Sequence, residues 1–405
     1  MKITPKFKHQ IESMGKAAGI ILLWIFSTLH GMAQNSEMQQ IIQAVQQKYA
    51  PDKRTELFHV VAMQRKDTLV LKGETTSRQA YEEILSCARN GSAHVKDSIR
   101  MLPDKKLGEE IWGVIYNAVG TLRAEPRYSA ELVSQALLGL PVRILEQKGG
   151  WRRVQTPDRY IGWMNGSVEP MTKAEWQQYL KLPKVIVTSL NTRSFVDTTK
   201  EALPVTDLVA GDMLELVLAD GAYYRVRYPD GREAYVRKAD AMKVEEWLKS
   251  IKPTGESIVH TAKQLLGVPY LWGGTSVKGM DCSGFTKQVY FMHGIILARD
   301  ASQQVRYGRL IDEAGDFSEA LPGDLVFFGT KATPENPKER VVHVGIYIGE
   351  RRFIHASDFI RINSFDPADP LYDAFNTNRY LRTKRIIGEG NGEGIEEMFN
   401  NLTTP

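Results

Sequence analysis

The sequence predicts an α+β fold, in which a mixed helix and strand region and two small all-β barrels precede a C-terminal α+β domain. Three observations lead to this prediction. Apolar residues recur at helical spacing before residue 110 and after residue 253, short strand-like runs broken by Gly and Pro fill residues 112–172, and residues 205–242 repeat that pattern. A chain of 405 residues is also too long for one core, so several domains are expected.

The amino terminus has the pattern of a secretory signal peptide. Four lysines precede an apolar run from Ala17 to Leu29, which ends near Gly31-Met32-Ala33. The run of 13 residues is shorter than the roughly 20 that a membrane-spanning helix needs. We therefore expect residues 1–33 to be cleaved and the mature chain to be periplasmic or secreted, without a stable membrane anchor and as a monomer.

The charge balance excludes one class of partner. The whole chain carries 52 Lys and Arg against 48 Asp and Glu, a net charge of +4. Residues 1–33 hold four lysines and Glu12, so their removal takes away +3 and leaves about +1. Nucleic-acid recognition requires a basic face, and this composition gives no reason to expect one.

The region 34–110 combines two helical stretches with a hairpin, and no chemistry is assigned to it. The helices are expected in "MQQIIQAVQQKYA" and "SRQAYEEILSCA", and the hairpin in "LFHVVAMQRKDTLVLKG", which turns at Lys66 and Asp67. Cys87 lies on the second helix and is expected to be a small core residue, although export would permit a disulfide with Cys282.

Residues 111–180 and 181–248 are expected to form two related barrels. In each, a turn ("QKGGW", "ADGAY") precedes an alternating strand, and a polar turn ("TPDR", "PDGR") precedes an aromatic strand ("YIGWM", "EAYVR"). The repeat length of roughly 60 to 90 residues is typical of paired domains rather than of a solenoid.

Residues 253–390 form the last predicted domain, in which Cys282 is expected to begin a helix. Asp281 is a plausible N-cap, Phe285 and Val289 follow at helical spacing, and Gly294 stands where the helix would stop. Unpaired N–H groups and the positive end of the helix dipole stabilise a thiolate, so we expect a lowered pKa and a nucleophilic Cys282.

Two histidines in "RVVHVGIYIGERRFIHAS" supply a base and a group to orient it. The alternation around His343 predicts a strand, and "RFIHAS" its antiparallel neighbour. His343 and His355 share a face if the connection has an odd number of residues, for instance three with Gly349 left-handed, and we expect that they do. His343 would then be the general base for Cys282, with His355 bonded to its far ring nitrogen.

Two other interpretations of these residues remain open. A histidine on a strand is often a half-buried side chain without a catalytic role, and one cysteine with two histidines can bind zinc. Because the sequence has no close-spaced Cys or His pair and no evident fourth ligand, neither a metal nor another cofactor is expected.

The segments "GVPYLWGGTSVKGMDCSGF", "LPGDLVFFG" and "HVGIYIGERRFIHAS" resemble the signature segments of NlpC-type cell-wall peptidases, which are papain-related cysteine hydrolases. The resemblance covers most of residues 253–390. It implies a papain-like catalytic domain with Cys282 as nucleophile, His343 as base and His355 as the third polar residue. It also implies that the hydroxyl of Tyr270 helps to stabilise the oxyanion beside the backbone N–H of Cys282.

The upstream barrels resemble the bacterial SH3-like domains of one branch of these enzymes, the γ-D-glutamyl-L-diamino acid endopeptidases. The likeness is carried by "TLRAEPRYSAELVSQALLGLPVRILEQKGGWRRVQTPDRYIGWM". It implies that the first barrel walls one end of the cleft and favours peptides with a free N-terminal L-alanine. Asp281 and Glu131 would then contact the ammonium group, and Ser283, Tyr160 and Asp300 would line the site.

The sequence therefore predicts an exported cysteine endopeptidase whose partners are peptidoglycan peptides. It would hydrolyse the bond between γ-D-glutamate and a diamino acid, lysine or diaminopimelate, in small soluble muropeptides. Two alternatives remain, namely an amidase or acyltransferase with the same Cys-His-His site and a non-catalytic protein that binds the cell wall.

Overall fold

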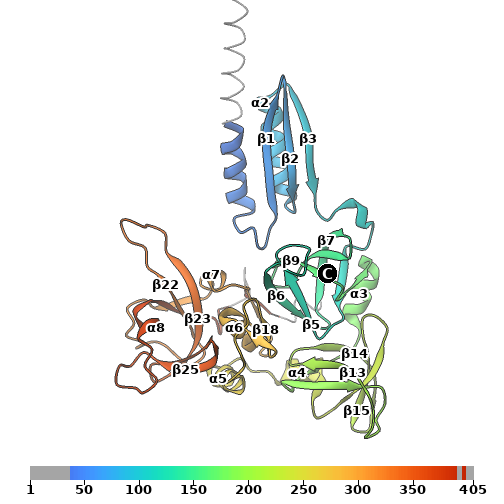
Figure 1. The fold of residues 1–405 in the computed structure, drawn as a ribbon, viewed down its shortest axis with the longest axis vertical. Coiled ribbons are helices and arrows are strands. Elements are labelled where there is room, and N and C mark those ends of the chain that lie inside the picture. Colours follow the sequence, from blue (N-terminus) through green and yellow to red (C-terminus); the bar gives the residue numbers. More distant parts are fainter. Residues whose placement is uncertain (1–36, 390–394, 398–405) are drawn as a thin grey trace, which may run out of the picture. The chain divides into compact units, whose positions relative to one another are not determined.

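The computed structural model describes residues 37–389 and 395–397, and the chain divides into two compact units at residues 105 and 106. Figure 1 shows the ribbon, with the expected signal peptide over residues 1–33 outside the described residues. Within the described ranges, no helix is long and apolar enough to cross a membrane.

The first unit packs two helices against a three-stranded sheet. Its elements are a helix over residues 37–49, β1 (Phe58–Arg65), β2 (Thr68–Thr75), α2 (Arg78–Gly91) and β3 (His94–Met101). β1 and β2 form the predicted hairpin with its turn at Lys66 and Asp67, and β3 adds to β2 in parallel. Both predicted helices are present.

Cys87 of α2 is partly exposed, which corrects its expected place in the core. The buried face of α2 consists of Ala80, Ile84, Leu85 and Ala88. Since 100° separates successive helical residues, Cys87 points beside this face rather than into it. Cys87 and Cys282 are both free cysteines in this structure.

The second unit begins with two seven-stranded antiparallel barrels, as the repeated pattern predicts. The first contains β4 (Trp112–Ile115), β5 (Val119–Arg123), β6 (Leu132–Leu137), β7 (Pro141–Lys148), β8 (Trp151–Gln155), β9 (Ile161–Asn165) and β10 (Val168–Met171). The second contains β11 (Lys184–Val187), β12 (Asn191–Phe195), β13 (Pro204–Val209), β14 (Met213–Asp220), β15 (Tyr223–Arg227), β16 (Glu233–Arg237) and β17 (Ala241–Lys243). A short 3-10 turn, η1 (Lys105–Leu107), precedes them.

The two barrels have the same strand order. The first is arranged β10-β4-β7-β8-β9-β5-β6, and the second, read from its other edge, is β17-β11-β14-β15-β16-β12-β13. β7 starts at Pro141 and β14 at Met213, so the repeat is 72 residues (213 minus 141). Each barrel is followed by a helix, α3 (Lys173–Lys181) and α4 (Val244–Ser250). The sequence repeat is therefore a duplicated domain.

The C-terminal region is a six-stranded sheet with helices on it, the α+β arrangement predicted for residues 253–390. Its helices are α5 (Gly255–Gln264), α6 (Cys282–Phe291), α7 (Ala301–Gln304) and α8 (Ala374–Asn378). The sheet order is β21-β26-β22-β23-β24-β25, formed by β21 (Arg309–Asp312), β22 (Leu325–Thr330), β23 (Arg340–Gly349), β24 (Arg352–Ser357), β25 (Phe359–Ser364) and β26 (Tyr380–Arg385). Two small pairs complete it, β18 (Thr275–Ser276) with β19 (Gly279–Met280), and β20 (Ile295–Leu297) with β27 (Ile395–Glu397).

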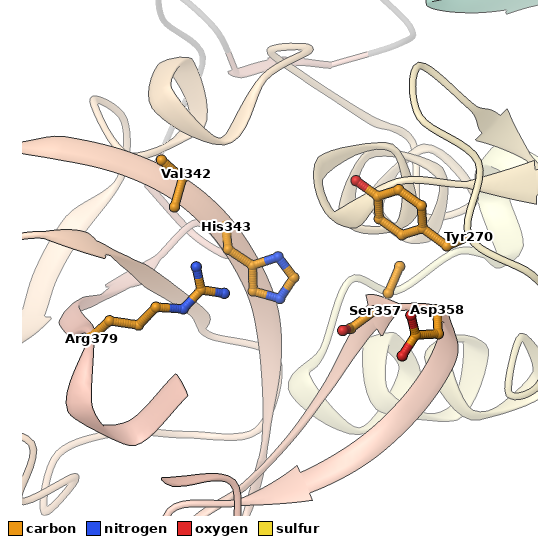
Figure 2. A pocket seen from close by; sticks show the side chains of 7 residues that line it. Tyr270, Val342, His343, Ser357, Asp358 and Arg379 are labelled. Carbon is orange, nitrogen blue, oxygen red and sulfur yellow. The ribbon is translucent and has the colours of Figure 1, made fainter. Parts of the chain in front are cut away.

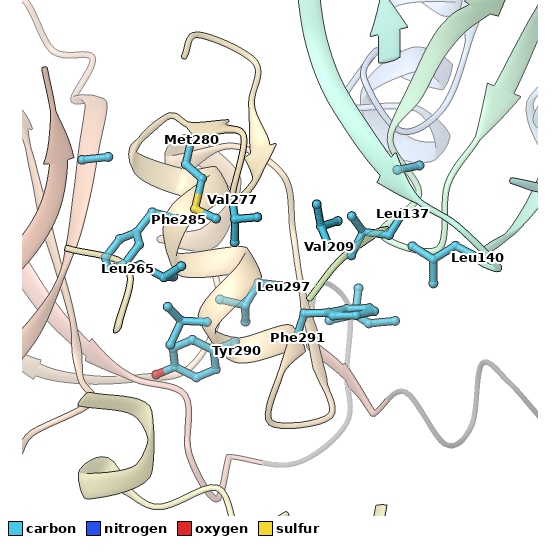
Figure 3. Packing of buried hydrophobic residues seen from close by; sticks show 14 of the residues in the cluster. Leu137, Leu140, Val209, Leu265, Val277, Met280, Phe285, Tyr290, Phe291 and Leu297 are labelled. Atoms are coloured by element: carbon cyan, nitrogen blue, oxygen red, sulfur yellow. The ribbon is translucent and has the colours of Figure 1, made fainter. Parts of the chain in front are cut away.

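One hydrophobic cluster joins the barrels to the C-terminal region. It contains Leu137 of β6, Val209 of β13 and Phe285 and Phe291 of α6, all nearly excluded from solvent. Figure 3 shows Leu137 and Val209 beside Phe291 at the carboxyl end of α6. Because burial of apolar surface is the main stabilising term, this shared core fixes the barrels relative to the helix that begins at Cys282.

Candidate active site

Cys282 is the first residue of α6, and the local sequence explains why the helix starts there. Asp281 has extended backbone angles, and its carboxylate accepts a hydrogen bond from the backbone N–H of Gly284 at 2.7 Å. This is the N-cap that the sequence predicts. α6 packs on β23 and β24, the strands that carry the two histidines. The backbone N–H of Val344, next to His343, donates to that sulfur.

His343 and His355 lie on one face of the sheet, as the parity of the hairpin predicts. The shared face does not come from the three-residue loop that was given as an example, but from a shorter turn with a β-bulge beside it. Gly349 pairs with Arg352, a two-residue turn separates them, and a bulge between Tyr347 and Gly349 supplies the extra residue. Gly349 does have a left-handed φ of 91°. The Nε2 atom of His343 lies 2.7 Å from the Nδ1 atom of His355.

Asn363 of β25, which the sequence did not single out, extends this pair to a chain of three side chains. Its Nδ2 donates to the carbonyl of Leu371 at 3.1 Å, and its Oδ1 lies 2.8 Å from Nε2 of His355. The amide oxygen can only accept, so Nε2 of His355 carries a proton and Nδ1 of that neutral ring accepts from Nε2 of His343. His343 therefore keeps Nδ1 as its acceptor, which is the nitrogen a general base requires.

The electrostatics of Cys282 differ from the sequence prediction. Burial, and next the nearby Asp281 carboxylate, raise the pKa of the Cys282 thiol to about 12, outweighing backbone hydrogen bonds from Val344 and Ser283. The predicted lowering of this pKa is therefore wrong for the free chain. The helix dipole contributes only on the order of 1 kcal/mol and cannot offset the loss of hydration at Cys282, a residue that is 8% exposed.

Both imidazoles are neutral at neutral pH. Burial lowers the pKa of His343 well below its ordinary value, and the proximity of His355 and Arg379 lowers it further. Burial also lowers the pKa of His355 to about 4. The resting pair is a thiol and a neutral imidazole, so proton transfer has to accompany attack by the sulfur.

Asp281 has a second set of contacts that occupies both of its oxygens. Arg299, which is 1% exposed, donates to Oδ2 at 2.6 Å and to Oδ1 at 3.1 Å, and the N–H of Gly273 donates to Oδ2 at 2.9 Å. The hydroxyl of Ser283 donates to Oδ1 and accepts from Arg299. Asp281 and Ser283 are thus parts of a buried network around Arg299. The sequence analysis did not single out Arg299, and its only signal was its position directly before Asp300.

Tyr270 and His343 line one open pocket of about 660 Å³. Figure 2 shows Tyr270 on one side of the His343 ring and Arg379 on the other. The pocket is lined by Tyr270, Val342, His343, Ala356, Ser357, Asp358 and Arg379. Burial and the neighbouring Cys282 raise the pKa of Tyr270, so its hydroxyl keeps its proton and can donate a hydrogen bond.

Glu131 and Tyr160 come from the first barrel, and Asp300 from the start of α7. The Glu131 carboxylate is exposed and accepts a hydrogen bond at 2.7 Å from Nε1 of Trp272, two residues after Tyr270. Tyr160 is 6% exposed, and Asp281, then Asp300 and last Tyr160 raise the pKa of Arg299 against the effect of burial. Asp300 lies 3.9 Å from Arg299. Arg299 is therefore the shared neighbour of Asp281, Asp300 and Tyr160.

The chain is similar to known proteins in both of its recognisable parts. The NlpC/P60 family matches residues 267–385, and the bacterial dipeptidyl-peptidase SH3 domain matches residues 122–167. A γ-D-glutamyl-L-lysine dipeptidyl-peptidase of Bacillus cereus is 32% identical over 234 residues, which are 56% of this chain and 67% of that protein. A protein named dipeptidyl-peptidase 6 from Lysinibacillus sphaericus is 29% identical over 64% of this chain and 93% of its own length.

Solved structures show the same likeness. A crystal structure of an NlpC/P60 family protein from Bacillus cereus has a TM-score of 0.57 and 26% identity, covering 68% of this chain and 99% of that one. An NlpC/P60 endopeptidase from Photobacterium damselae subsp. piscicida has a TM-score of 0.51 at 16% identity, over 70% of this chain and 73% of that one, which is a likeness of fold.

Proposed function

The chain belongs to the NlpC/P60 family, and from this premise we propose that it is a cysteine peptidase of cell-wall peptides. The bond it would hydrolyse joins γ-D-glutamate to a diamino acid, in peptides that carry a free N-terminal L-alanine. The relative from Bacillus cereus is named for action on a γ-D-glutamyl-L-lysine unit, and the first barrel matches the SH3 domain of bacterial dipeptidyl-peptidases.

The chain of His343, His355 and Asn363 behind Cys282 is the observation that carries this proposal. Its hydrogen bonds of 2.7 and 2.8 Å leave Nδ1 of His343 as the proton acceptor. The sulfur of Cys282 attacks the γ-carbonyl carbon of D-glutamate while His343 takes the thiol proton. His343 then returns the proton to the departing amine of the diamino acid, and a water activated by His343 hydrolyses the thioester.

Attack by the sulfur places negative charge on the carbonyl oxygen, and hydrogen-bond donors are needed to stabilise it. The backbone N–H of Cys282 belongs to the first turn of α6, where N–H groups have no intrahelical acceptor. The protonated hydroxyl of Tyr270 supplies a second donor beside the pocket. We assign both to stabilisation of the oxyanion.

The other end of the peptide carries an ammonium group, which we assign to Glu131 and Asp300 with Tyr160 beside them. Asp281, which the sequence also offered for this contact, is 6% exposed and holds Arg299 with both oxygens, so we give it the role of positioning Arg299. A carboxylate that loses water to a bound peptide without gaining a cationic partner is costly, so a free N-terminal amine should favour binding.

The first barrel bears on the size of the substrate, and residues 1–33 bear on the location of the protein. Because the first barrel lies against the loop of Trp272, it restricts the cleft to short peptides, and we propose soluble muropeptides as the substrates. We further propose that residues 1–33 direct export to the periplasm or the medium, where cell-wall peptides occur.

The direct test uses the peptide L-Ala-γ-D-Glu-L-Lys and follows release of free lysine by amino-acid analysis. We expect cleavage by the mature chain and a loss of about 1,000-fold or more in kcat for Cys282→Ala, as for nucleophiles of other hydrolases. Cys87→Ala removes the other thiol, outside the site, and is the matched control that should keep wild-type activity.

Two results would contradict the proposal. If lysine is not released but another amide bond or an acyl transfer depends on Cys282, the chain is an amidase or acyltransferase of the same family. If Cys282→Ala retains full hydrolytic activity, the site is not catalytic and the barrels become the functional part.

A further inference from the structure

The pocket beyond His343 carries opposite charges on its two sides. Arg379 and Asp358 both line it, together with His343 and Tyr270. Figure 2 shows the Arg379 guanidinium turned toward the His343 ring, with Asp358 beneath Tyr270 on the other side of that ring. None of the roles assigned to this point uses either charge.

Arg379 is held in place without a direct ion pair, although the carboxylate of Asp373 lies close enough to favour its charged form. It follows α8, and its guanidinium carbon lies 4.3 Å from the centroid of the Phe375 ring. Its Nε and Nη2 donate to the amide oxygen of Asn376 at 2.9 and 2.7 Å. Among the described residues, no carboxylate lies within ion-pair distance of Arg379. A fixed guanidinium with unused N–H groups is well suited to a carboxylate ligand.

Asp358 is the corresponding anion. Its side chain is 81% exposed and lies 3.5 Å from Arg361, which is a weak, solvated ion pair. Its own carbonyl accepts a hydrogen bond from the N–H of Tyr270 at 2.8 Å, so its position is tied to Tyr270 at the wall of the pocket.

We propose that this pocket receives the diamino acid on the leaving side of the scissile bond, with Arg379 binding its α-carboxylate and Asp358 its side-chain ammonium. The inference rests on the proposed function and adds the recognition of the leaving group to it.

The chemistry of the leaving group fixes which charge meets which residue. The nitrogen that His343 protonates is bonded to the carbon that carries the α-carboxylate, so this carboxylate lies close to His343, where Arg379 points. The side-chain ammonium is at the end of a flexible four-carbon stem and extends away from His343. It can therefore reach the opposite side of the pocket, where Asp358 stands.

A consequence is that the chain prefers peptides that end at the diamino acid. Extension by one more residue, or amidation of the α-carboxylate, replaces the charged partner of Arg379 by a neutral amide. A neutral hydrogen bond is weaker than a charge-assisted one, so such peptides are cleaved less efficiently.

The test compares L-Ala-γ-D-Glu-L-Lys with the same peptide ending in a carboxamide, as the ratio of the two kcat/KM values within one enzyme preparation. This ratio does not depend on the fraction of folded enzyme. We expect the wild type to favour the carboxylate about 10-fold or more. Arg379→Gln should bring the ratio close to one, and Arg379→Lys, which keeps the charge, should restore part of it.

Asp358 is tested in the same way with lysine against norleucine at the third position. Asp358 has a φ of 60°, so Asp358→Asn is the suitable variant because asparagine tolerates this conformation. We expect it to remove the preference for lysine. Arg309→Gln is the matched control, since Arg309 is exposed on β21 and pairs with Glu389, and it should keep both wild-type ratios.

The outcomes separate this inference from the proposed function. If the wild type releases lysine but Arg379→Gln keeps the full preference for the carboxylate, this inference is overturned and the peptidase assignment stands. If the wild type releases neither lysine from the carboxylate peptide nor lysinamide from the carboxamide peptide, the proposed function fails and this inference fails with it.

Discussion

The two barrels share one topology, but they make different contributions to the candidate site. The first carries Glu131 and Tyr160, which we propose for the ammonium site, whereas the corresponding positions of the second, 72 residues later, hold Leu203 and Arg232. Leu203 is 71% exposed, and Arg232 pairs with the adjacent Asp230. The proposed difference in binding therefore rests on individual side chains and not on strand order, which the two barrels share.

The second barrel acts instead as a support. The carbonyl of its Ala210 accepts a hydrogen bond from Gln288 of α6 at 2.9 Å. The carboxylate of Asp212 accepts from the N–H of Leu138 in the first barrel at 3.1 Å, and the N–H of Met213 donates to the carbonyl of Leu138 at 2.9 Å. The turn over residues 209–212 thus braces both the first barrel and the helix of Cys282.

The largest expected effect comes from the contact between the barrels. Gly139 has a φ of 82°, and a Cβ there would lie 2.2 Å from the backbone oxygen of Met213. We expect Gly139→Ala to cost about 3 kcal/mol of unfolding free energy, from strain and displacement of the second barrel. Gly149→Ala is the control, because Gly149 also has a positive φ but open space around it, and it should cost about 1 kcal/mol. Equal losses in urea unfolding would show that the barrels do not brace each other.

Lys184 of the second barrel corresponds to Trp112 of the first, 72 residues earlier. The same position therefore holds a buried amine in one barrel and an uncharged side chain in the other. The ammonium of Lys184 donates to the carbonyls of Tyr179, Leu180 and Leu182, and burial lowers its pKa to about 8. Between pH 8 and roughly 10.4, the usual lysine pKa, the unfolded chain binds more protons than the folded one, so stability rises with pH across this window.

We expect the wild type to gain about 1–2 kcal/mol of unfolding free energy over Lys184→Met between pH 7.5 and pH 10.5. The carbonyl contacts favour the charged amine and keep the gain below the full effect of the shift. Urea unfolding of both proteins at several pH values measures it, and parallel curves would count against a lowered pKa.

Glu131 and Leu203 compare the barrels in function. Glu131→Gln removes a negative charge from the proposed ammonium site, and we expect a fall of about 10-fold in kcat/KM on L-Ala-γ-D-Glu-L-Lys. The selectivity for this peptide over its N-acetylated form should fall as well. Leu203→Gln, at the corresponding position of the second barrel, should change neither value. A similar loss in both variants would mean that Glu131 has no contact with substrate.

The smallest effect is expected for the residue that holds Glu131. Nε1 of Trp272 donates to the Glu131 carboxylate at 2.7 Å, although the indole itself is 63% exposed. Trp272→Phe keeps an aromatic side chain but removes the N–H that donates to Glu131. We therefore expect a rise of about 3-fold in KM with kcat little changed. A large fall in kcat would instead place Trp272 at the reacting atoms.

Features that depend on neighbours along the chain could be predicted from the sequence. The N-cap at Asp281, the helix that begins at Cys282 and the shared face of His343 and His355 follow from local periodicity and capping rules. The duplication was visible because turn residues recur at corresponding places in both barrels. The β-bulge next to the two-residue turn, which puts both histidines on one face, could not be predicted. A bulge has no distinct residue signature in this hairpin.

Features that depend on distant segments could not be predicted. Asn363 and Arg379 carry no local motif, and each takes its place only when β25 and α8 pack near β24 and β23. The sequence showed an acidic residue before Cys282, but the partner of Asp281, Arg299, lies 18 positions further on. The exposure of Cys87 was mispredicted because it lies at the edge of a helical face, where small rotations decide burial.

The sequence by itself determined which residues begin each element, which positions share a face and where the chain repeats, because these are consequences of backbone geometry and side-chain spacing over a few residues. Tertiary structure decided the charges in the site. A pKa depends on the water and the charges around a group, so the thiol of Cys282, predicted to be acidic from its helix, is held protonated by burial and by the carboxylate of Asp281.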